Sequence, residues 1–196
     1  PEQNVVKKRK GDKDLNRKWF NAIFSGSLEK TIRFIENGVD VNSVVGLHNR
    51  TALHAASLLG YVDIVKVLIR SGAGVNAVDK DGQTPLHLSI TKGHVHVVQV
   101  LSVNGADMNA VDAYYLSALN YAVSNANVPC ALQLLCCGAK VDEGAIKSDK
   151  TNLLRSIKER LEKLRSDNIM GASLMSNEEA QYLHCLAFAL AVKFPG

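Results

Sequence analysis

Residues Asp81–Asp112 read DGQTPLHLSITKGHVHVVQVLSVNGADMNAVD, and in them two helix patterns alternate with turn residues. Thr84 is a typical N-cap residue, and Pro85 stands at the first helical position, where its missing amide hydrogen leaves no bond unmade. Gly93 and Gly105 follow the two apolar runs and permit the left-handed backbone that often ends a helix. The stretch therefore predicts two short helices joined by a tight turn.

The same phrase occurs thirty-three residues earlier, where Asn49–Asp79 read NRTALHAASLLGYVDIVKVLIRSGAGVNAVD. A single helix pair cannot bury its own apolar face, whereas stacked copies can, with each copy touching mainly its neighbours. The repetition therefore predicts a solenoid whose core is lined by the recurring apolar positions. These positions are Leu53, Leu68, Leu86, Val97, Val98 and Leu101.

The copy at 81–112 resembles an ankyrin repeat, because the T-P-L-H and G-A-D-x-N phrases of that family stand in it at the family's separation, and the copy at 49–79 is a second close match. Two diverged copies flank them, RKWFNAIFSGSLEKTIRFIENGVDVNSV before and SALNYAVSNANVPCALQLLCCGAKVD after. The resemblance covers about residues 14–142, as four repeats. It implies an all-α solenoid of helix-turn-helix repeats, with β-turn fingers projecting at one edge.

The diverged copies depart from the pattern at particular places. The first replaces T-x-L-H by Arg17-Lys18-Trp19-Phe20, as a capping repeat would, and we expect Trp19 to fill space there. Its spacing to the second copy is 34 rather than 33, and the extra residue falls in SVVGLHN, so we expect an irregular first finger. The last copy has Ala126 where the glycine between the helices is expected.

The regions outside the repeats differ in character. Residues 1–13 are interpreted as a flexible basic arm. Residues 143–166 are interpreted as a linker and a long, divergent capping helix. Residues 167–196 are interpreted as a loop and an apolar C-terminal helix, which we expect to lead into a region missing from this segment.

The composition, 46% apolar and 21% charged, is that of a globular protein, and no apolar run is long enough to cross a bilayer. The four cysteines lack the spacing of a metal site or a disulfide framework, which favours an intracellular location, cytoplasmic or nuclear or both. No catalytic arrangement has a recognisable context. We therefore predict no enzyme activity, no small-molecule substrate and no cofactor.

The histidines do not indicate a metal site. His94 and His96 stand two residues apart on a helix and so do not share a face, as two metal ligands would. The family resemblance implies that His54 and His87 form hydrogen bonds between turns.

The net charge of +4 comes entirely from residues 1–18, which hold seven Lys or Arg and three acidic residues. The basic run Lys7, Lys8, Arg9 and Lys10 is a possible nuclear localisation signal, a phosphate-contacting arm or a solvated linker. The other residues are neutral overall. Nucleic-acid binding through the arm is therefore only a second alternative function.

The resemblance also implies where a partner binds, namely at the finger tips and the exposed side of the first helices. Many residues there are apolar or aromatic, and exposed apolar clusters usually mark contact sites. We expect apolar anchors to dominate, with Lys92 and Arg50 at the rim. The predicted partner-binding residues are Phe24, Leu47, Arg50, Leu58, Leu59, Val78, Lys80, Asp81, Gln83, Lys92, Tyr114 and Leu116.

Some of these residues have a purely structural alternative. Phe24 and Leu58 could pack between neighbouring helices, and Tyr115, at the position of the turn glycine, could merely prop its finger. Leu59 and Tyr114 are expected to lie outside the core, so that replacing either should change stability little.

Asn42 and Asn109 stand in the G-V-D-V-N and G-A-D-M-N phrases. In resembling family members, the asparagine of such a phrase can be hydroxylated by an intracellular asparaginyl hydroxylase. The main role expected for Asn42 is structural, as a side-chain cap of its own hairpin.

Together these observations predict a non-enzymatic protein-protein interaction module that binds a partner protein or peptide through its concave groove and finger tips. A pre-formed concave surface would lose little ordering entropy on binding. One alternative is an intramolecular regulatory or scaffolding module of a larger multidomain protein, whose catalytic domain lies outside this segment. The apolar last helix favours that alternative, because it needs a neighbour to cover it.

Overall fold

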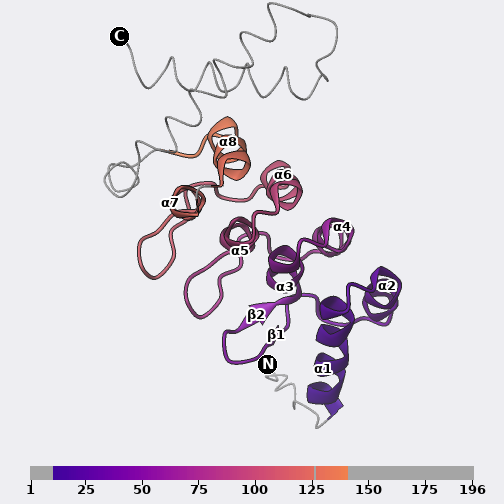
Figure 1. The fold of residues 1–196 in the computed structure, drawn as a ribbon. Coiled ribbons are helices and arrows are strands. Elements are labelled where there is room, and N and C mark those ends of the chain that lie inside the picture. Colours follow the sequence, from indigo (N-terminus) through magenta and orange to yellow (C-terminus); the bar gives the residue numbers. More distant parts are fainter. Residues whose placement is uncertain (1–10, 126, 141–196) are drawn as a thin grey trace, which may run out of the picture.

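The computed structural model describes residues 11–125 and 127–140, and over these residues the chain forms four consecutive helix pairs (Figure 1). The first helices of the pairs are α1 (Gly11–Phe24), α3 (Ala52–Leu59), α5 (Pro85–Thr91) and α7 (Ala118–Ser124). The second helices are α2 (Leu28–Glu36), α4 (Val62–Arg70), α6 (Val95–Val103) and α8 (Val128–Cys136). Between the first two pairs lie two short strands, β1 (Val44–Val45) and β2 (Arg50–Thr51).

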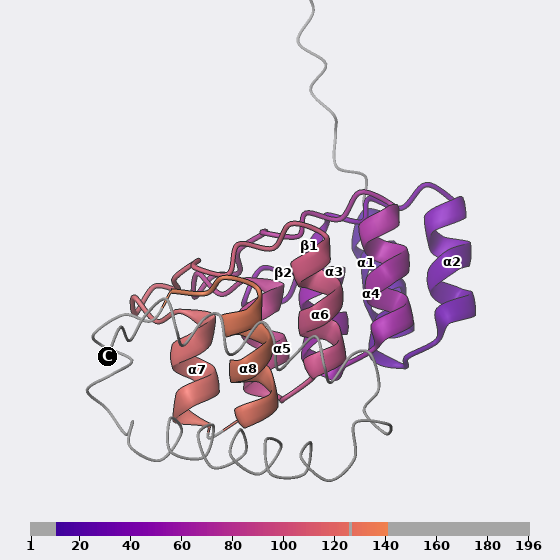
Figure 2. The same ribbon diagram turned by 90° about the horizontal axis from the view of Figure 1, so that it is seen from above.

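The pairs stack in one direction, so that α1, α3, α5 and α7 form an inner row and α2, α4, α6 and α8 form an outer row (Figure 1). The helices stand side by side when the stack is seen from above (Figure 2). The loops that connect one pair to the next extend beyond the inner row as three fingers. The expected all-α solenoid with projecting fingers is therefore confirmed.

The N-terminal boundary differs slightly from the expectation, because α1 begins at Gly11 rather than after a flexible arm that ends at residue 13. The expected arm up to residue 10, the expected capping helix in 143–166 and the apolar helix in 167–196 lie outside the described residues. The same holds for Ala126.

The first helices begin as the sequence predicts. The hydroxyls of Thr51 and Thr84 accept the backbone N–H of His54 and His87, and each imidazole Nδ1 accepts the threonine's backbone N–H in return. This is a capping box in which histidine takes the usual place of glutamate or glutamine. Pro85 occupies the first turn of α5, as expected.

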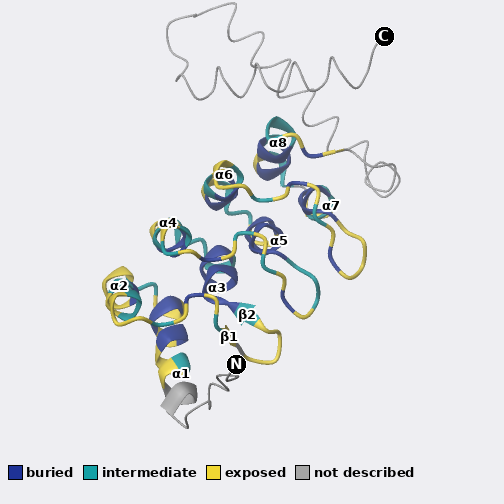
Figure 3. Cartoon of the chain, turned by 180° about the vertical axis from the view of Figure 1, so that it is seen from behind, coloured by how far each residue is buried: buried dark blue, intermediate teal, exposed yellow. Residues whose placement is uncertain are grey.

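The core lies where the helices of adjacent pairs face one another, with exposed residues at the finger tips and on the outer helices (Figure 3). All the leucines and valines predicted to be core are at most 1% exposed. Trp19 is fully buried against Phe34, with ring centroids 5.9 Å apart, so it fills space in the first repeat as expected.

The turn between the two helices of a pair is covered by a side chain from the following pair. His94, the N-cap of α6, donates from Nε2 to the carbonyl oxygen of Leu58 at 3.1 Å, and its ring lies over Gly60. A Cβ added to Gly60 would lie 2.6 Å from two ring atoms. Tyr61 covers Gly26 in the same way, one repeat earlier. Glycine is therefore favoured here for two reasons. It accepts the left-handed backbone, and its lack of a Cβ leaves room for the ring that covers the turn.

These two requirements can be separated by comparing Gly60→Ala with Gly38→Ala. Both glycines have φ +76°, but nothing lies within 4 Å of a Cβ at Gly38. Gly38→Ala should lower the free energy of unfolding by about 1–2 kcal/mol, the strain of a left-handed alanine. Gly60→Ala should cost about 1–3 kcal/mol more, because it also displaces the hydrogen-bonded ring.

Urea unfolding of both variants would measure the difference. His94→Ala in the Gly60→Ala background should recover the steric part of the loss. Equal losses for the two single variants would show that the ring over Gly60 is not held there.

Candidate partner-binding surface

The three fingers are joined to one another through their backbones. The amide of Lys80 donates to the carbonyl oxygen of His48 at 2.8 Å, and the amide of Ala113 donates to the carbonyl oxygen of Asp81 at 3.0 Å. Neighbouring fingers are therefore linked at their tips and not only at their bases. We call the exposed residues of the fingers 44–50, 78–83 and 111–116, with those at the C-terminal ends of the first helices, the finger face.

The first finger keeps a regular base despite its extra residue. Val44 pairs with Thr51 and Val45 with Arg50 in an antiparallel ladder, with four residues between the inner pair. The second finger closes through Asp79 and Gln83, with three residues between them. The expected irregularity of the first finger is thus confined to its turn, which is one residue longer than that of the second finger.

Histidine joins each central repeat to the finger that follows. Nε2 of His54 donates to the carbonyl oxygen of Gln83 at 3.0 Å, and Nε2 of His87 donates to that of Leu116 at 3.2 Å. Both side chains are fully buried. The expected hydrogen bonds between turns are confirmed. In the fourth repeat the position holds Asn120, whose Oδ1 accepts the backbone N–H of Ser117 in its own capping box.

A buried carboxylate organises each of the two later fingers. Asp79 accepts the backbone amides of Asp81 and Gln83 and pairs with Arg50 Nε at 3.0 Å. Arg50 was expected at the rim of the binding surface. Its half-buried side chain is instead engaged by Asp79, because the carboxylate is fully buried and needs a counter-charge.

Asp112, the buried carboxylate of the third finger, is stabilised by hydrogen bonds rather than by a cation. It accepts the hydroxyl of Tyr121 at 2.6 Å and the backbone amides of Tyr114 and Leu116. Gln83, at the position of Arg50 one repeat later, donates to the Tyr121 hydroxyl at 2.9 Å. Burial raises the pKa of Asp112, but these hydrogen bonds outweigh it and leave the pKa below its usual value. Gln83, predicted as a contact residue, therefore has a structural role as well.

The finger asparagines bridge adjacent repeats. Asn42 donates from Nδ2 to the carbonyl oxygen of Gly72 at 3.0 Å and accepts the amide of Gly74 at 2.8 Å. Asn109 accepts the amide of Lys140 at 2.7 Å. The expected role of Asn42 as a cap of its own hairpin was wrong, because its side chain crosses to the next repeat. Hydroxylation of Asn42 or Asn109 stays a prediction.

Valine recurs at one exposed position of every finger. Val44, Val78 and Val111 each follow the finger asparagine by two residues, and each is at least half exposed. Because the repeats stack, these side chains form a row along the finger face. Repeated exposure of the same apolar residue is not expected of a solvated surface.

The tip of the third finger is aromatic. Tyr114 is 72% exposed and Tyr115 is 83% exposed, and Leu116 beside them is also exposed. Tyr115 has φ +60°, a left-handed conformation that tyrosine rarely adopts. The structural alternative, in which Tyr115 only props its finger, is not favoured, because most of its side chain faces solvent.

The helix ends contribute unequally to the finger face. Phe24 is 55% exposed, with its ring tilted against Phe20 at 6.4 Å. Leu58 and Leu59 are half-buried. Leu59 is thus less free of packing than we expected, and its role in binding stays a prediction. Leu47 and Lys80 project from the fingers as exposed side chains, and Lys92 is exposed at the end of α5.

Other predicted features have no counterpart that the structure can test. Lys7–Lys10 lie outside the described residues, and their role as a localisation signal stays a prediction. Within residues 11–125 and 127–140, no group of three or more histidine, cysteine or acidic residues could hold a metal ion. Among the same residues, no helix has both the length and the apolar character of a membrane span.

Burial raises the pKa of the Cys130 thiol to about 11.

Comparison with known families agrees with this architecture. A family model of three ankyrin repeats matches residues 19–112 and, in a second position, residues 71–145. The chain therefore belongs to the ankyrin-repeat family. Ankyrin repeats are generally protein-protein interaction modules, and the family is generally non-enzymatic.

The buried histidines make stability depend on pH. Burial, only partly offset by the carbonyl acceptors, lowers the pKa of His54 and His87 below the usual value of about 6.5. The unfolded chain then binds protons that the folded chain excludes. Stability should therefore fall as pH decreases from about 7 to about 5, by up to about 1.4 kcal/mol per pH unit for each histidine.

Urea unfolding at a series of pH values would measure this slope. His87→Asn, which introduces the residue of the fourth repeat, should lower stability near neutral pH but also reduce the slope by about half, because one of two buried imidazoles is gone. A slope unchanged in His87→Asn would contradict the account.

Proposed function

We propose that this chain is a non-enzymatic interaction module that binds a segment of a partner protein across its finger face. The general role of ankyrin repeats supports this proposal. So does the row of exposed valines, which ends at the aromatic tip of the third finger. The observation that carries the proposal is the backbone of Tyr115.

The position of Tyr115 requires a left-handed backbone in all three fingers. The first finger has Asn49 there with φ +52°, and the second has Gly82 with φ +74°, two residue types that accept this conformation. A tyrosine there costs about 1–2 kcal/mol. Little within the described fold offsets this cost, since the ring is 83% exposed.

Such strain is typical of functional sites, and exposed tyrosines are typical of interface anchors. The finger face would present these anchors in a fixed arrangement, because histidine and backbone hydrogen bonds already hold the fingers together. Binding would then require little ordering of the protein itself. The finger tips and Phe24 are better anchors than the half-buried Leu58 and Leu59, which the sequence had placed at the centre.

Tyr115→Gly separates the two effects of this residue. The variant should raise the melting temperature, because glycine relieves the left-handed strain, yet it should weaken binding by about 1–3 kcal/mol through loss of an anchor. Tyr114→Ala should weaken binding by a similar amount with little effect on melting. Peptides selected from a random display library on the whole chain would serve as ligands for titration calorimetry.

The matched control is Val103→Ala. Val103 is 79% exposed at the end of α6 in the outer row, so its truncation removes an equally exposed apolar side chain away from the finger face. Its binding should equal that of the parent protein. If Tyr115→Gly and Tyr114→Ala also bind like the parent, the finger face is not the contact surface.

A further inference from the structure

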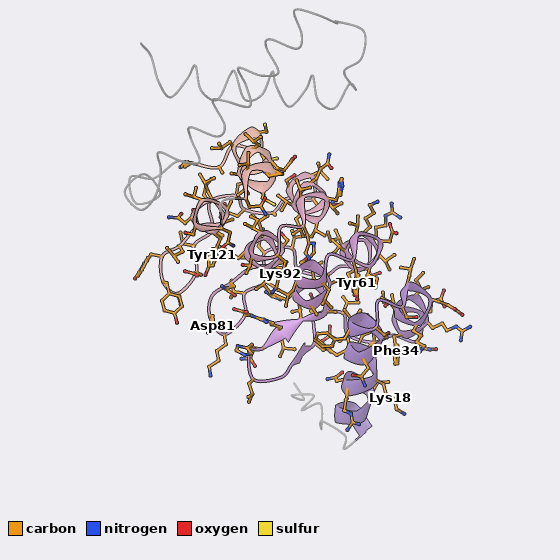
Figure 4. All side chains as sticks on the ribbon, in the orientation of Figure 1. Lys18, Phe34, Tyr61, Asp81, Lys92 and Tyr121 are labelled. Atoms are coloured by element: carbon orange, nitrogen blue, oxygen red, sulfur yellow. The ribbon has the colours of Figure 1, made fainter. Side chains whose placement is uncertain are left out.

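The acidic side chains of the finger face are all engaged within the protein. Asp79 pairs with Arg50, and Asp112 accepts the hydroxyl of Tyr121. Asp81, at the tip of the second finger, lies 3.3 Å from the ring Nδ1 of His48 (Figure 4). Two of these three carboxylates are buried, and only Asp81 is partly accessible. The negative charge that a partner could reach on this face is therefore that of Asp81.

The basic side chains of the same face are not balanced in this way. Lys80 and Lys92 are both exposed, and neither is within ion-pair distance of a carboxylate among the described residues. On the outer helices, Glu29 pairs with Arg33 at 2.7 Å and Asp63 lies 3.7 Å from Lys66, whereas Lys30 and Arg70 are exposed without an ion pair in the described part of the chain. On the finger face, the two exposed ammonium groups thus outnumber the one partly accessible carboxylate, that of Asp81.

Local structure explains only part of this arrangement. Lys92 is the C-cap of α5, where the helix dipole favours a cation. That effect accounts for a basic residue at this position, but it leaves the exposed ammonium group without a counter-ion. Lys80 uses its backbone amide to bond His48, and Val78, two residues earlier in the same finger, is exposed. Ammonium groups beside exposed apolar side chains suit a ligand that is both acidic and apolar.

We propose that the finger face selects an acidic segment of a partner protein that also carries apolar side chains. Its carboxylates would lie opposite Lys80 and Lys92, and its apolar side chains would contact Val78 and the tyrosine tip. This inference rests on the proposed function and specifies the chemistry of the partner. A nucleic acid would also supply anions, but two lysines among apolar side chains do not form the extended basic surface that contacts many phosphates.

Composition of selected ligands tests the inference directly. Random peptides displayed on phage would be selected on the immobilised whole chain, and in parallel on the double variant Lys80→Glu/Lys92→Glu. Peptides selected on the parent should be enriched in Asp and Glu relative to the starting library. The double variant should select peptides without this enrichment.

One selected acidic peptide is then titrated against both proteins by fluorescence anisotropy over a salt series. Charge reversal should reduce affinity about tenfold or more at low salt, and the difference should shrink as salt rises. The matched control is Lys30→Glu/Lys66→Glu, which makes the same charge change on α2 and α4 in the outer row. It should bind like the parent. Melting curves would establish that each variant is folded.

The results of these experiments distinguish failure of the acidic preference from failure of the proposed interaction function. Selected peptides that are neutral or basic, yet lose binding to Tyr115→Gly, would overturn the acidic preference and leave the interaction surface in place. Peptides insensitive to every finger variant, or no selected peptides at all, would overturn both. Tighter binding of a single-stranded oligonucleotide than of any acidic peptide, with the same dependence on Lys80 and Lys92, would assign the surface to nucleic acid instead.

Discussion

The buried imidazole of a central repeat makes two connections at once. In His54, Nδ1 closes the capping box of its own helix, while Nε2 reaches the carbonyl oxygen of Gln83 in the next finger. The ring can do both only as the neutral tautomer that carries its proton on Nε2. The second and third fingers are thereby fixed relative to the helix of the preceding repeat. The relative placement of the fingers, and hence any surface across them, depends on this bond.

Once the polar groups at the finger bases are paired internally, the residues left over determine what the surface can recognise. The buried carboxylates Asp79 and Asp112 take up Arg50 and Tyr121 as partners. The remaining exposed groups are the valine row, the tyrosine pair and two lysines. The chemistry of recognition thus follows from which side chains the framework does not use, and the left-handed Tyr115 is the clearest case of a residue that the framework does not need.

The sequence was sufficient for the fold, because the signals that carry it are local and repeated. Thr84 and Pro85 indicate a helix start, and the spacing of the leucines indicates the buried face. Both features could therefore be predicted from the sequence alone. The site was less predictable, because its properties depend on contacts between repeats. Nothing near Arg50 in the sequence indicates that Asp79, 29 residues away, would engage it. The half-burial of Leu59 and the crossing of Asn42 to Gly72 depend on neighbours in the same way.

One signal for Tyr115 was present in the sequence, where propping its finger stood as the structural alternative to binding. Aligning the repeats places Tyr115 with Gly82 and Asn49, and only the latter two tolerate a left-handed backbone. That mismatch already indicated backbone strain at Tyr115. The exposure of its ring, which only the structure shows, is what makes the strain evidence for a function rather than for packing.

The central claim is that the fingers form one pre-arranged surface before any partner binds. Native-state hydrogen exchange of the Lys80 and Ala113 amides tests it most directly, since these amides donate to the preceding finger. The account predicts that both exchange with protection approaching that of amides in the middle of α3 and α5. Exchange of both amides at the rate of an unprotected loop, with the helices still protected, would contradict it.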